Sequence, residues 1–266
     1  MAHVPTLRSV TSSTPPTQPN KFTDSPETAP TLPGRIALVG SGEYLPVMEP
    51  IEAWLLENKP PRYVLIATAA VPDGVARLRN WHELGAQAAQ RLGAEQIVID
   101  IRTRADADDP AHFEAINGAG LIYLSGGKPQ FLANTLRGTR TWDVIWKNWR
   151  AGASIAGCSA GAMALCGYVP DFRHPKRGGT DGLGLIPDLR VIPHFDRFAA
   201  HLPDLALRPL VADTATTIGI DENTALIADS SPDQTWVFRS RGEASVWRLG
   251  TERRSRVNGA LELRVG

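Results

Sequence analysis

Cysteine, net charge and long hydrophobic runs are all scarce in this sequence. Its 266 residues include two cysteines, Cys158 and Cys166, which excludes a disulfide framework and does not match a zinc-binding pattern. Such sparing use of cysteine favours a reducing compartment, so we expect a cytoplasmic protein. No apolar run approaches the ~18 residues that a membrane-spanning helix needs.

The charges balance, with 28 Lys and Arg against 28 Asp and Glu. A chain without net charge gives no electrostatic reason to expect nucleic acid or an anionic membrane surface as a partner. Hydrophobic residues make up 42% of the chain, enough for a core of substantial size. We therefore expect a globular protein.

Residues 1–33 differ in composition from the rest, because they are rich in Pro, Thr and Ser and contain no apolar block of signal-peptide length. Such a segment buries too little apolar surface to offset the entropy of ordering it. We predict a disordered tail over 1–33 and a single folded domain over 34–266. A targeting or docking segment is the alternative for the tail.

Short apolar runs alternate with helical patterns in the first part of the domain. This alternation is typical of βαβ units, which build a parallel sheet covered on both faces. It predicts an α/β three-layer sandwich with a mostly parallel sheet. The expected strands are 35–40, 61–70, 95–101 and 120–127, the expected helices are 47–58, 75–92, 110–117 and 129–150, and 152–167 reads as a strand that runs into a helix.

The last part of the chain has a different pattern, in which apolar runs are separated by short turns. We expect these runs to form an antiparallel C-terminal extension of the sheet. Because such an extension has edge strands that can pair with a second copy, a homodimer is one possible assembly. The loop 170–188 has no periodicity, and long loops of this kind are often functional. The expected strands are 189–195, 217–228, 235–240, 244–250 and 260–266.

The stretch GCSAG at 157–161 fits the pattern G-x-S-x-G. In this pattern a nucleophile sits on a sharp turn between a strand and a helix, and the glycines leave room for the turn. The central residue projects out of such a turn while its predecessor points inward. We therefore predict Ser159 as the nucleophile and Cys158 as a packing residue, although a tight turn without catalysis can carry the same small residues.

A serine nucleophile needs a base, and His194 is the best candidate. It ends the apolar run LRVIP, and active sites of open parallel sheets collect at the carboxyl ends of strands. The other histidines lie in the tail, in expected helices or in loops: His3, His82, His112, His174 and His201.

The acid that would orient the base has three candidates. Asp196 is two residues from His194, so both side chains face one way on an extended segment. Asp171 lies in the loop after the nucleophile helix, and Asp181 lies further along the same loop. For the oxyanion hole we expect the backbone N–H groups of Ala160 and of Gly127.

Five segments then occur in a recognisable order. Together they resemble the family of serine peptidases that contains dipeptidase E (the aspartyl dipeptidase) and cyanophycinase. The resemblance covers roughly residues 34–230. The segments are GSGE (40–43), YLSGGKPQFLANTL (123–136), AGCSAGAMAL (156–165), IPHF (192–195) and GIDENTALI (219–227).

The resemblance implies a class I glutamine amidotransferase-like, flavodoxin-like fold with a serine in place of the amidotransferase cysteine. The family's nucleophile falls on Ser159, its histidine on His194 and its oxyanion glycine on Gly127. Its acid lies a little over twenty residues before the histidine, which favours Asp171. In the amidotransferases the acid follows the histidine by two, which keeps Asp196 as the alternative.

The implied activity is a serine-type peptidase or amidohydrolase that cleaves a small peptide or isopeptide through a Ser-His-Asp acyl-enzyme mechanism, without a metal or organic cofactor. A non-peptidase amide or ester hydrolase and a catalytically silent metabolite-binding protein are the alternatives. Lys128 and Pro129 follow the glycine pair and Pro193 precedes the histidine, so neither relative's substrate carries over unchanged. The candidate substrate-binding residues are Gly126, Lys128, Gln130, Arg197 and Glu43.

Overall fold

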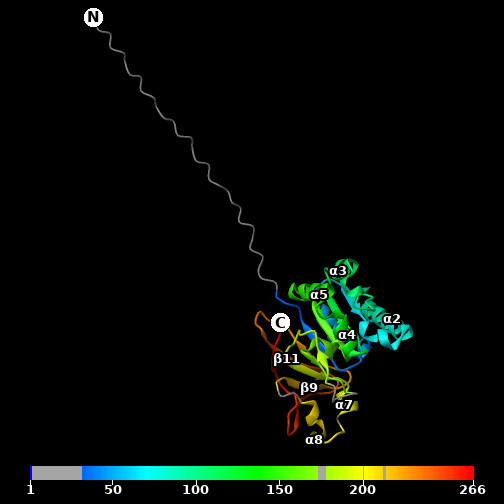
Figure 1. Cartoon of the computed structure of the whole chain (residues 1–266), viewed down its shortest axis with the longest axis vertical. Helices are drawn as coiled ribbons and strands as arrows, with labels where there is room; N and C mark the ends of the chain where they lie inside the picture. The colour runs from blue at the N-terminus through cyan, green and yellow to red at the C-terminus, as the bar shows by residue number, and fades with distance from the viewer. Residues whose placement is uncertain (2–31, 173–177, 200, 212–213) are drawn as a thin grey trace. The chain divides into compact units, whose positions relative to one another are not determined.

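The computed structural model describes residues 1, 32–172, 178–199, 201–211 and 214–266 (Figure 1). Thr31–Gly266 forms one compact unit, and Met1–Pro30 forms a second that is almost entirely outside the described residues. The expected disorder of the tail 1–33 falls on the undescribed residues 2–31 and stays a prediction. Within the described ranges, no helix is both long and apolar enough to cross a membrane.

An eight-stranded sheet forms the centre of the unit, in the order β14-β11-β10-β1-β5-β4-β2-β3. The first five strands of the chain are parallel, and the last three added to the sheet are antiparallel. The parallel strands are β1 (Ile36–Val39), β2 (Arg62–Ile66), β3 (Glu95–Val98), β4 (Leu121–Leu124) and β5 (Ser154–Cys158). The antiparallel strands are β10 (Thr224–Ala228), β11 (Thr235–Gly242) and β14 (Leu261–Arg264).

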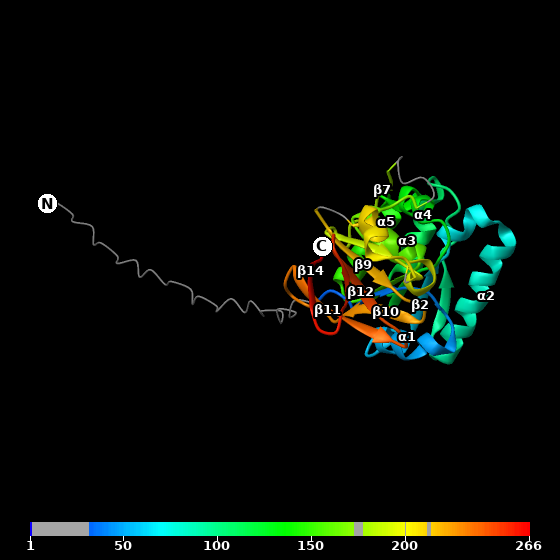
Figure 2. The same ribbon diagram turned by 90° about the horizontal axis from the view of Figure 1, so that it is seen from below.

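Helices cover both faces of this sheet because the inner parallel strands β1, β2, β4 and β5 are buried on both sides. In β1, Ile36 and Leu38 face one core cluster, and Ala37 and Val39 face the other. Figure 2 shows α1 on one side of the sheet and α3, α4 and α5 on the other. One layer contains α1 (Glu49–Leu56) and α2 (Val75–Arg91); the other contains α3 (Pro110–Ile116), α4 (Pro129–Leu136), α5 (Arg140–Arg150) and α6 (Ala160–Leu165). The predicted three-layer α/β sandwich is confirmed.

The single helix expected over 129–150 is two helices. Gly138 has φ +66° at the break, a conformation that interrupts a right-handed helix. Thr139 then caps α5, where its side-chain oxygen accepts a hydrogen bond from the Trp142 N–H. Short 3-10 helices occupy η1 (Pro46–Met48), η2 (Thr68–Asp73), η3 (Asp106–Asp108) and η5 (Arg208–Leu210).

The C-terminal strands divide between two sheets, which corrects the expectation that they all extend the first. A four-stranded sheet has the order β13-β12-β9-β8, and its β8 and β9 are parallel. Its strands are β8 (Leu189–Ile192), β9 (Thr216–Ile220), β12 (Val246–Leu249) and β13 (Arg254–Arg256). The remaining elements are the pair β6 (Tyr168–Val169) and β7 (Thr180–Asp181), and the short helices α7 (Phe195–Phe198) and α8 (Asp204–Leu207).

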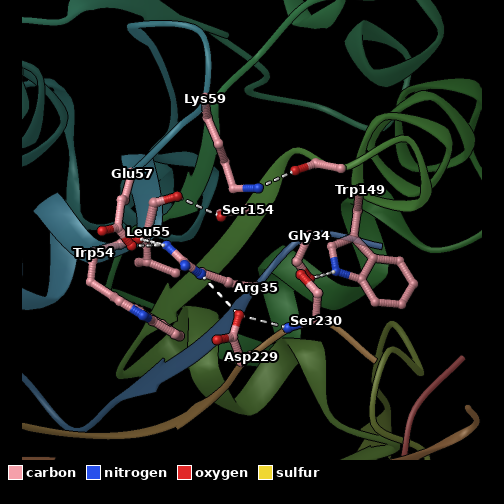
Figure 3. A network of polar contacts seen from close by, with 11 residues as sticks. Gly34, Arg35, Trp54, Leu55, Glu57, Lys59, Trp149, Ser154, Asp229 and Ser230 are labelled. Carbon is pink, nitrogen blue, oxygen red and sulfur yellow. Dashed lines mark hydrogen bonds and ion pairs between the residues drawn. The ribbon is translucent and has the colours of Figure 1, made fainter. Parts of the chain in front are cut away.

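A polar network ties the strands together at the amino end of β1 (Figure 3). Arg35 lies 2.9 Å from the carboxylate of Glu57 and 3.0 Å from that of Asp229. At the start of β5, the Ser154 hydroxyl donates to the Leu55 carbonyl oxygen at 2.6 Å. These contacts fasten α1 and the start of β5 at one edge of the sheet.

The opposite, carboxyl edge collects several loops. The segments after β1, β4 and β5 begin at Gly40, Ser125 and Ser159, and all three strands are parallel neighbours or next neighbours in the sheet. In the second sheet, β8 and β9 are also parallel, and they are followed by Pro193 and Asp221. Side chains from five separate segments can therefore converge at this edge.

Candidate active site

Ser159 occupies a strained turn between β5 and α6. Its backbone has φ +49° and ψ −105°, a conformation that residues with a side chain rarely adopt and that costs ~1–3 kcal/mol. The neighbouring glycines are required by close packing: a Cβ on Gly157 would lie 2.4 Å from the Gly161 carbonyl carbon, and one on Gly161 would lie 2.1 Å from the Leu124 oxygen. The sequence therefore produces the sharp bend that G-x-S-x-G predicted.

His194 lies directly beside Ser159. It follows β8 in the left-handed conformation, with φ +49° and ψ +39°. Its Nε2 is 3.0 Å from the Ser159 Oγ, a hydrogen-bond distance. The two residues that sequence analysis selected as nucleophile and base are thus brought together from opposite sheets.

The second imidazole nitrogen of His194 contacts Glu222, not Asp171 or Asp196. Its Nδ1 is 2.8 Å from the Glu222 Oε1, and the other oxygen of that carboxylate lies 2.7 Å from the Arg197 Nε. Asp196 instead accepts the backbone N–H of Glu222 at 3.0 Å. The structure therefore does not place Asp171, the expected acid, on the imidazole, and Asp196 holds the backbone of Glu222.

Asp171 and Asp181 have other positions. Asp171 lines the cavity in front of the site. Asp181 is exposed in β7, where it pairs with Tyr168 of β6. Its backbone oxygen accepts a hydrogen bond from Arg137.

Sequence reasoning missed Glu222 because the run 217–228 resembles one strand. In the structure the run is broken into β9 and β10, which belong to different sheets, and Asn223 at the break has φ +52°. Asp221 on the other side of Glu222 is buried and accepts hydrogen bonds from the Trp247 indole N–H at 3.1 Å and the Ser245 N–H at 3.1 Å. The polar triplet 221–223 inside an apolar run was the available signal of a turn.

The backbone after β4 provides a candidate oxyanion hole. A Cβ on Gly126 would lie 3.6 Å from the Ser159 Cβ, so this loop passes directly beside the nucleophile. Gly127 has φ +145°, and a Cβ there would lie 2.2 Å from the Ala69 oxygen. Within the part of the chain that the structure describes, the N–H groups of Gly127 and Ala160 donate to no other protein group. Both remain available for a substrate oxygen.

Cys158 points away from the site. It is fully buried, and its thiol donates to the Glu43 Oε2 at 2.7 Å. Burial, together with the nearby Glu43 charge, raises the pKa of the Cys158 thiol well above its ordinary value. The thiol is therefore protonated and shielded, which agrees with its expected role in packing.

Glu43 does not face a substrate, in contrast to the expectation from sequence. Only 5% of it is exposed, and its Oε1 accepts the Gly126 N–H at 3.0 Å. Gly126, also expected to bind substrate, has its N–H engaged by this carboxylate. Glu43 therefore lies behind the site.

A cavity of about 790 Å³ is lined by His194, whose Nε2 contacts the Ser159 Oγ, and by Gly127. Its wall is mainly apolar, with side chains from the nucleophile helix, from the loops after β6 and β8, and from α4 and α7. The apolar side chains are those of Pro129, Met163, Pro170, Phe172, Ile192, Pro193 and Phe198. The volume suits a small ligand.

Three of the expected substrate-binding residues line this cavity, and each has a partner. Lys128 forms an ion pair with Asp73 at 2.9 Å, and Gln130 donates to the Pro170 oxygen at 3.1 Å. Arg197 holds Glu222 through Nε, while its side chain is 77% exposed. The described residues contain no cluster of three or more His, Cys, Asp or Glu side chains arranged to hold a metal ion.

A family model and a curated relative both match this chain. The model of peptidase family S51 matches residues 36–232. A cyanophycinase from Geminocystis herdmanii (strain PCC 6308) is 29% identical over 148 residues, which are 51% of this chain and 53% of that protein. The chain therefore spans about half the length of this curated relative.

Comparison with solved structures supports the same family. A peptidase from an acI-B1 Actinobacterium has 40% identity and a TM-score of 0.78, over 88% of this chain and 98% of that one. A putative peptidase E protein from Listeria monocytogenes EGD-e has 18% identity and a TM-score of 0.58, over 80% of this chain and 100% of that one, and shows the shared fold. Since the family model spans residues 36–232, the resemblance drawn from the motifs is confirmed and the chain belongs to peptidase family S51, a family of serine peptidases.

Proposed function

We propose that this chain is a serine-type peptidase or amidohydrolase that cleaves a small peptide or isopeptide through an acyl-enzyme on Ser159. One observation carries the proposal: Ser159 Oγ, His194 and Glu222 form a continuous hydrogen-bonded series, with distances of 3.0 Å and 2.8 Å on the two imidazole nitrogens. This is the arrangement of nucleophile, base and orienting acid that acyl transfer needs.

The reaction begins when Ser159 Oγ attacks the substrate carbonyl and passes its proton to His194 Nε2. Glu222 accepts the hydrogen bond from Nδ1–H, so that Nε2 is the unprotonated nitrogen facing the serine. The same carboxylate stabilises the imidazolium that forms. The Gly127 and Ala160 N–H groups bind the developing oxyanion.

The intermediate collapses when His194 gives its proton to the leaving amine and the C–N bond breaks. Water then attacks the acyl-enzyme, His194 removes a proton from it, and Ser159 Oγ leaves with that proton. A glutamate replaces the aspartate of the Ser-His-Asp mechanism expected from the sequence. Arg197 and Asp196 hold this glutamate by its second oxygen and by its backbone N–H.

The cavity supports a small substrate rather than a folded protein. Its volume of about 790 Å³ matches a ligand of a few residues, and its apolar wall lies on the side of Phe172 and Phe198. Among the described residues that line the cavity, Lys128 and the exposed side chain of Arg197 are cations that could bind a substrate carboxylate. The likeness to a cyanophycinase and to a peptidase supports a peptide or isopeptide bond as the target.

A fluorophosphonate probe tests the nucleophile, and a panel of dipeptides tests the substrate. The wild-type protein should be labelled on Ser159, Ser159→Ala should not, and at least one member of a panel of Asp-X, β-Asp-Arg and apolar dipeptides should be hydrolysed. Labelling with hydrolysis of esters but of no peptide would favour the non-peptidase hydrolase. Folded wild-type protein that takes no label would favour the metabolite-binding alternative.

A further inference from the structure

Glu43 is a buried carboxylate whose two oxygens join different parts of the site. Its Oε1 accepts the N–H of Gly126 beside the nucleophile, and its Oε2 accepts the thiol of Cys158 immediately before the nucleophile. In the described part of the chain, no Lys, Arg or His nitrogen lies within ion-pair distance of it. Burying a carboxylate without a cation destabilises the folded protein, and no ion pair accounts for the burial of Glu43.

The loop after β1 holds Glu43 firmly in this place. The next residue, Tyr44, has φ +67°, and its hydroxyl lies 2.6 Å from the Ser125 Oγ. The Tyr44 N–H donates to Glu52 at 3.2 Å. The loop after β1 therefore contacts the loop after β4 at two adjacent points: Glu43 binds Gly126, and Tyr44 binds Ser125.

The four consecutive backbone N–H groups of residues 125–128 show the effect of these hydrogen bonds. Ser125 N–H donates to the Ile66 oxygen at 3.0 Å, and Lys128 N–H donates to the Ala69 oxygen at 2.7 Å. Gly126 N–H donates to Glu43 at 3.0 Å. Three of the four donors are occupied, and Gly127 N–H alone remains for a substrate.

Glu43 is also the connection between the two halves of the candidate oxyanion hole. One half, Gly127, follows the glycine that Glu43 holds, and the other half, Ala160, follows Cys158 by two residues. A shift of the loop against β5 would change the separation of these donors. Oxyanion stabilisation depends on donors placed about 2.7–3.1 Å from the developing charge.

We infer that Glu43 is a positioning residue that sets the distance between the Gly127 and Ala160 N–H donors by hydrogen-bonding Gly126 and Cys158 together. The inference rests on the proposed function. Glu43 acts through the backbone of Gly126 and not by contact with the substrate. Its own negative charge would oppose an oxyanion, so its benefit must come from geometry.

Glu43→Gln is the sharpest test, because it keeps the shape and one acceptor oxygen. A glutamine can accept from Gly126 or from the thiol of Cys158 but not from both. With p-nitrophenyl acetate as the substrate, we expect kcat to fall about tenfold while KM changes less than twofold, since the loss lies in the transition state. The second-order rate of fluorophosphonate labelling should fall by a similar factor.

Cys158→Ala tests the hydrogen bond to the second oxygen of Glu43. It can be used if Glu43→Gln does not fold. It leaves the Glu43 Oε2 without its donor, and we expect a smaller fall in kcat, about threefold to tenfold, that Cys158→Ser restores. Cys166→Ala is the matched control. Cys166 is an equally buried cysteine whose thiol donates to the Ala162 oxygen, so its loss should leave kcat unchanged.

The outcomes separate the two proposals. Suppose that the wild-type protein is labelled on Ser159 and that both Glu43→Gln and Cys158→Ala react at the wild-type rate. This result would overturn the positioning role alone. The same holds if kcat falls only in proportion to a loss of folded protein measured by circular dichroism. Wild-type protein that neither takes the label nor hydrolyses the ester would overturn the proposed function and this inference with it.

Discussion

Glu222 Oε1 lies 2.8 Å from the Nδ1 of His194, and the other nitrogen of the same imidazole lies 3.0 Å from Ser159 Oγ. The base comes from the end of β8 and the acid from the break between β9 and β10. Since β8 and β9 are parallel neighbours, the residues that follow them lie side by side. The second sheet thus positions the proposed base and acid, and the first sheet positions the proposed nucleophile.

Glu222→Gln should lower kcat strongly. An amide in place of the carboxylate can present an N–H to Nδ1 and stabilise the wrong tautomer, and such a change costs about 10⁴-fold in a serine protease. We expect a loss of at least about 10²-fold in kcat/KM for the best substrate of the dipeptide panel. Asp181→Asn, at an exposed position outside the cavity, is the control and should retain wild-type kinetics. Loss of activity in Asp171→Asn together with a fully active Glu222→Gln would contradict the assignment.

Gly127→Ala should abolish most activity because the position has no room for a side chain. A Cβ would lie 2.2 Å from the Ala69 oxygen, and the loop must move to relieve this contact. We expect at least about 10²-fold loss of kcat, the effect of removing one oxyanion donor. Gly74→Ala is the control: its φ is also positive, at +95°, but nothing lies within 4 Å of its added Cβ. It should cost about 1 kcal/mol of unfolding free energy and leave kcat intact, as measured by denaturant titration and initial rates.

Stability should fall as the pH rises through the pKa of Glu52. Burial raises this pKa to about 7, and among the described residues the carboxyl accepts hydrogen bonds from the Tyr44 N–H and the Tyr63 hydroxyl. Between the unfolded value near 4.5 and 7, the folded protein binds more protons than the unfolded one, so the unfolding free energy decreases with rising pH. Above pH 7 the accumulated loss is on the order of 2–4 kcal/mol.

Glu52→Gln, which mimics the protonated acid, should remove this contribution, as urea titrations at pH 5 and pH 8 would show. Glu49→Gln, at a partly exposed ion pair with Arg91, is the matched control and should keep the wild-type dependence on pH. An equal pH slope in the wild-type protein and in Glu52→Gln would refute the assignment of the shift to Glu52.

Neither cysteine should react with iodoacetamide in the folded protein. Cys158 and Cys166 are both fully buried, and burial raises the pKa of each thiol, so little thiolate is present at pH 8. Mass spectrometry should find no alkylation under native conditions and two modified cysteines after denaturation in urea. Rapid alkylation of Cys158 with loss of activity would show that the thiol is accessible and would undermine its place behind Ser159.

Much of the fold could be predicted because its signals are local. Short apolar runs separated by helical spacing produce β1, β2, β4 and β5, and their burial on both faces follows from apolar residues at consecutive positions. β3 lies at the edge of the sheet and is partly exposed. The bend at Ser159 is equally local, since it depends on Gly157 and Gly161. The break of the helix at Gly138 was missed, although glycine and threonine there carried the signal.

By itself, the sequence therefore determined the parallel α/β core, the nucleophile turn and, through the strand that precedes it, the position of His194. Only the tertiary structure decided which acid meets the imidazole and what Glu43 contacts. Glu222 lies in an apolar run that divides between two sheets, and no local pattern states which strands become neighbours. Asp171 and Asp196 lie nearer to His194 along the chain. The pairing of β8 with β9 nevertheless places Glu222 beside the imidazole ring. Hydrogen bonds depend on distance in space and not on separation along the sequence.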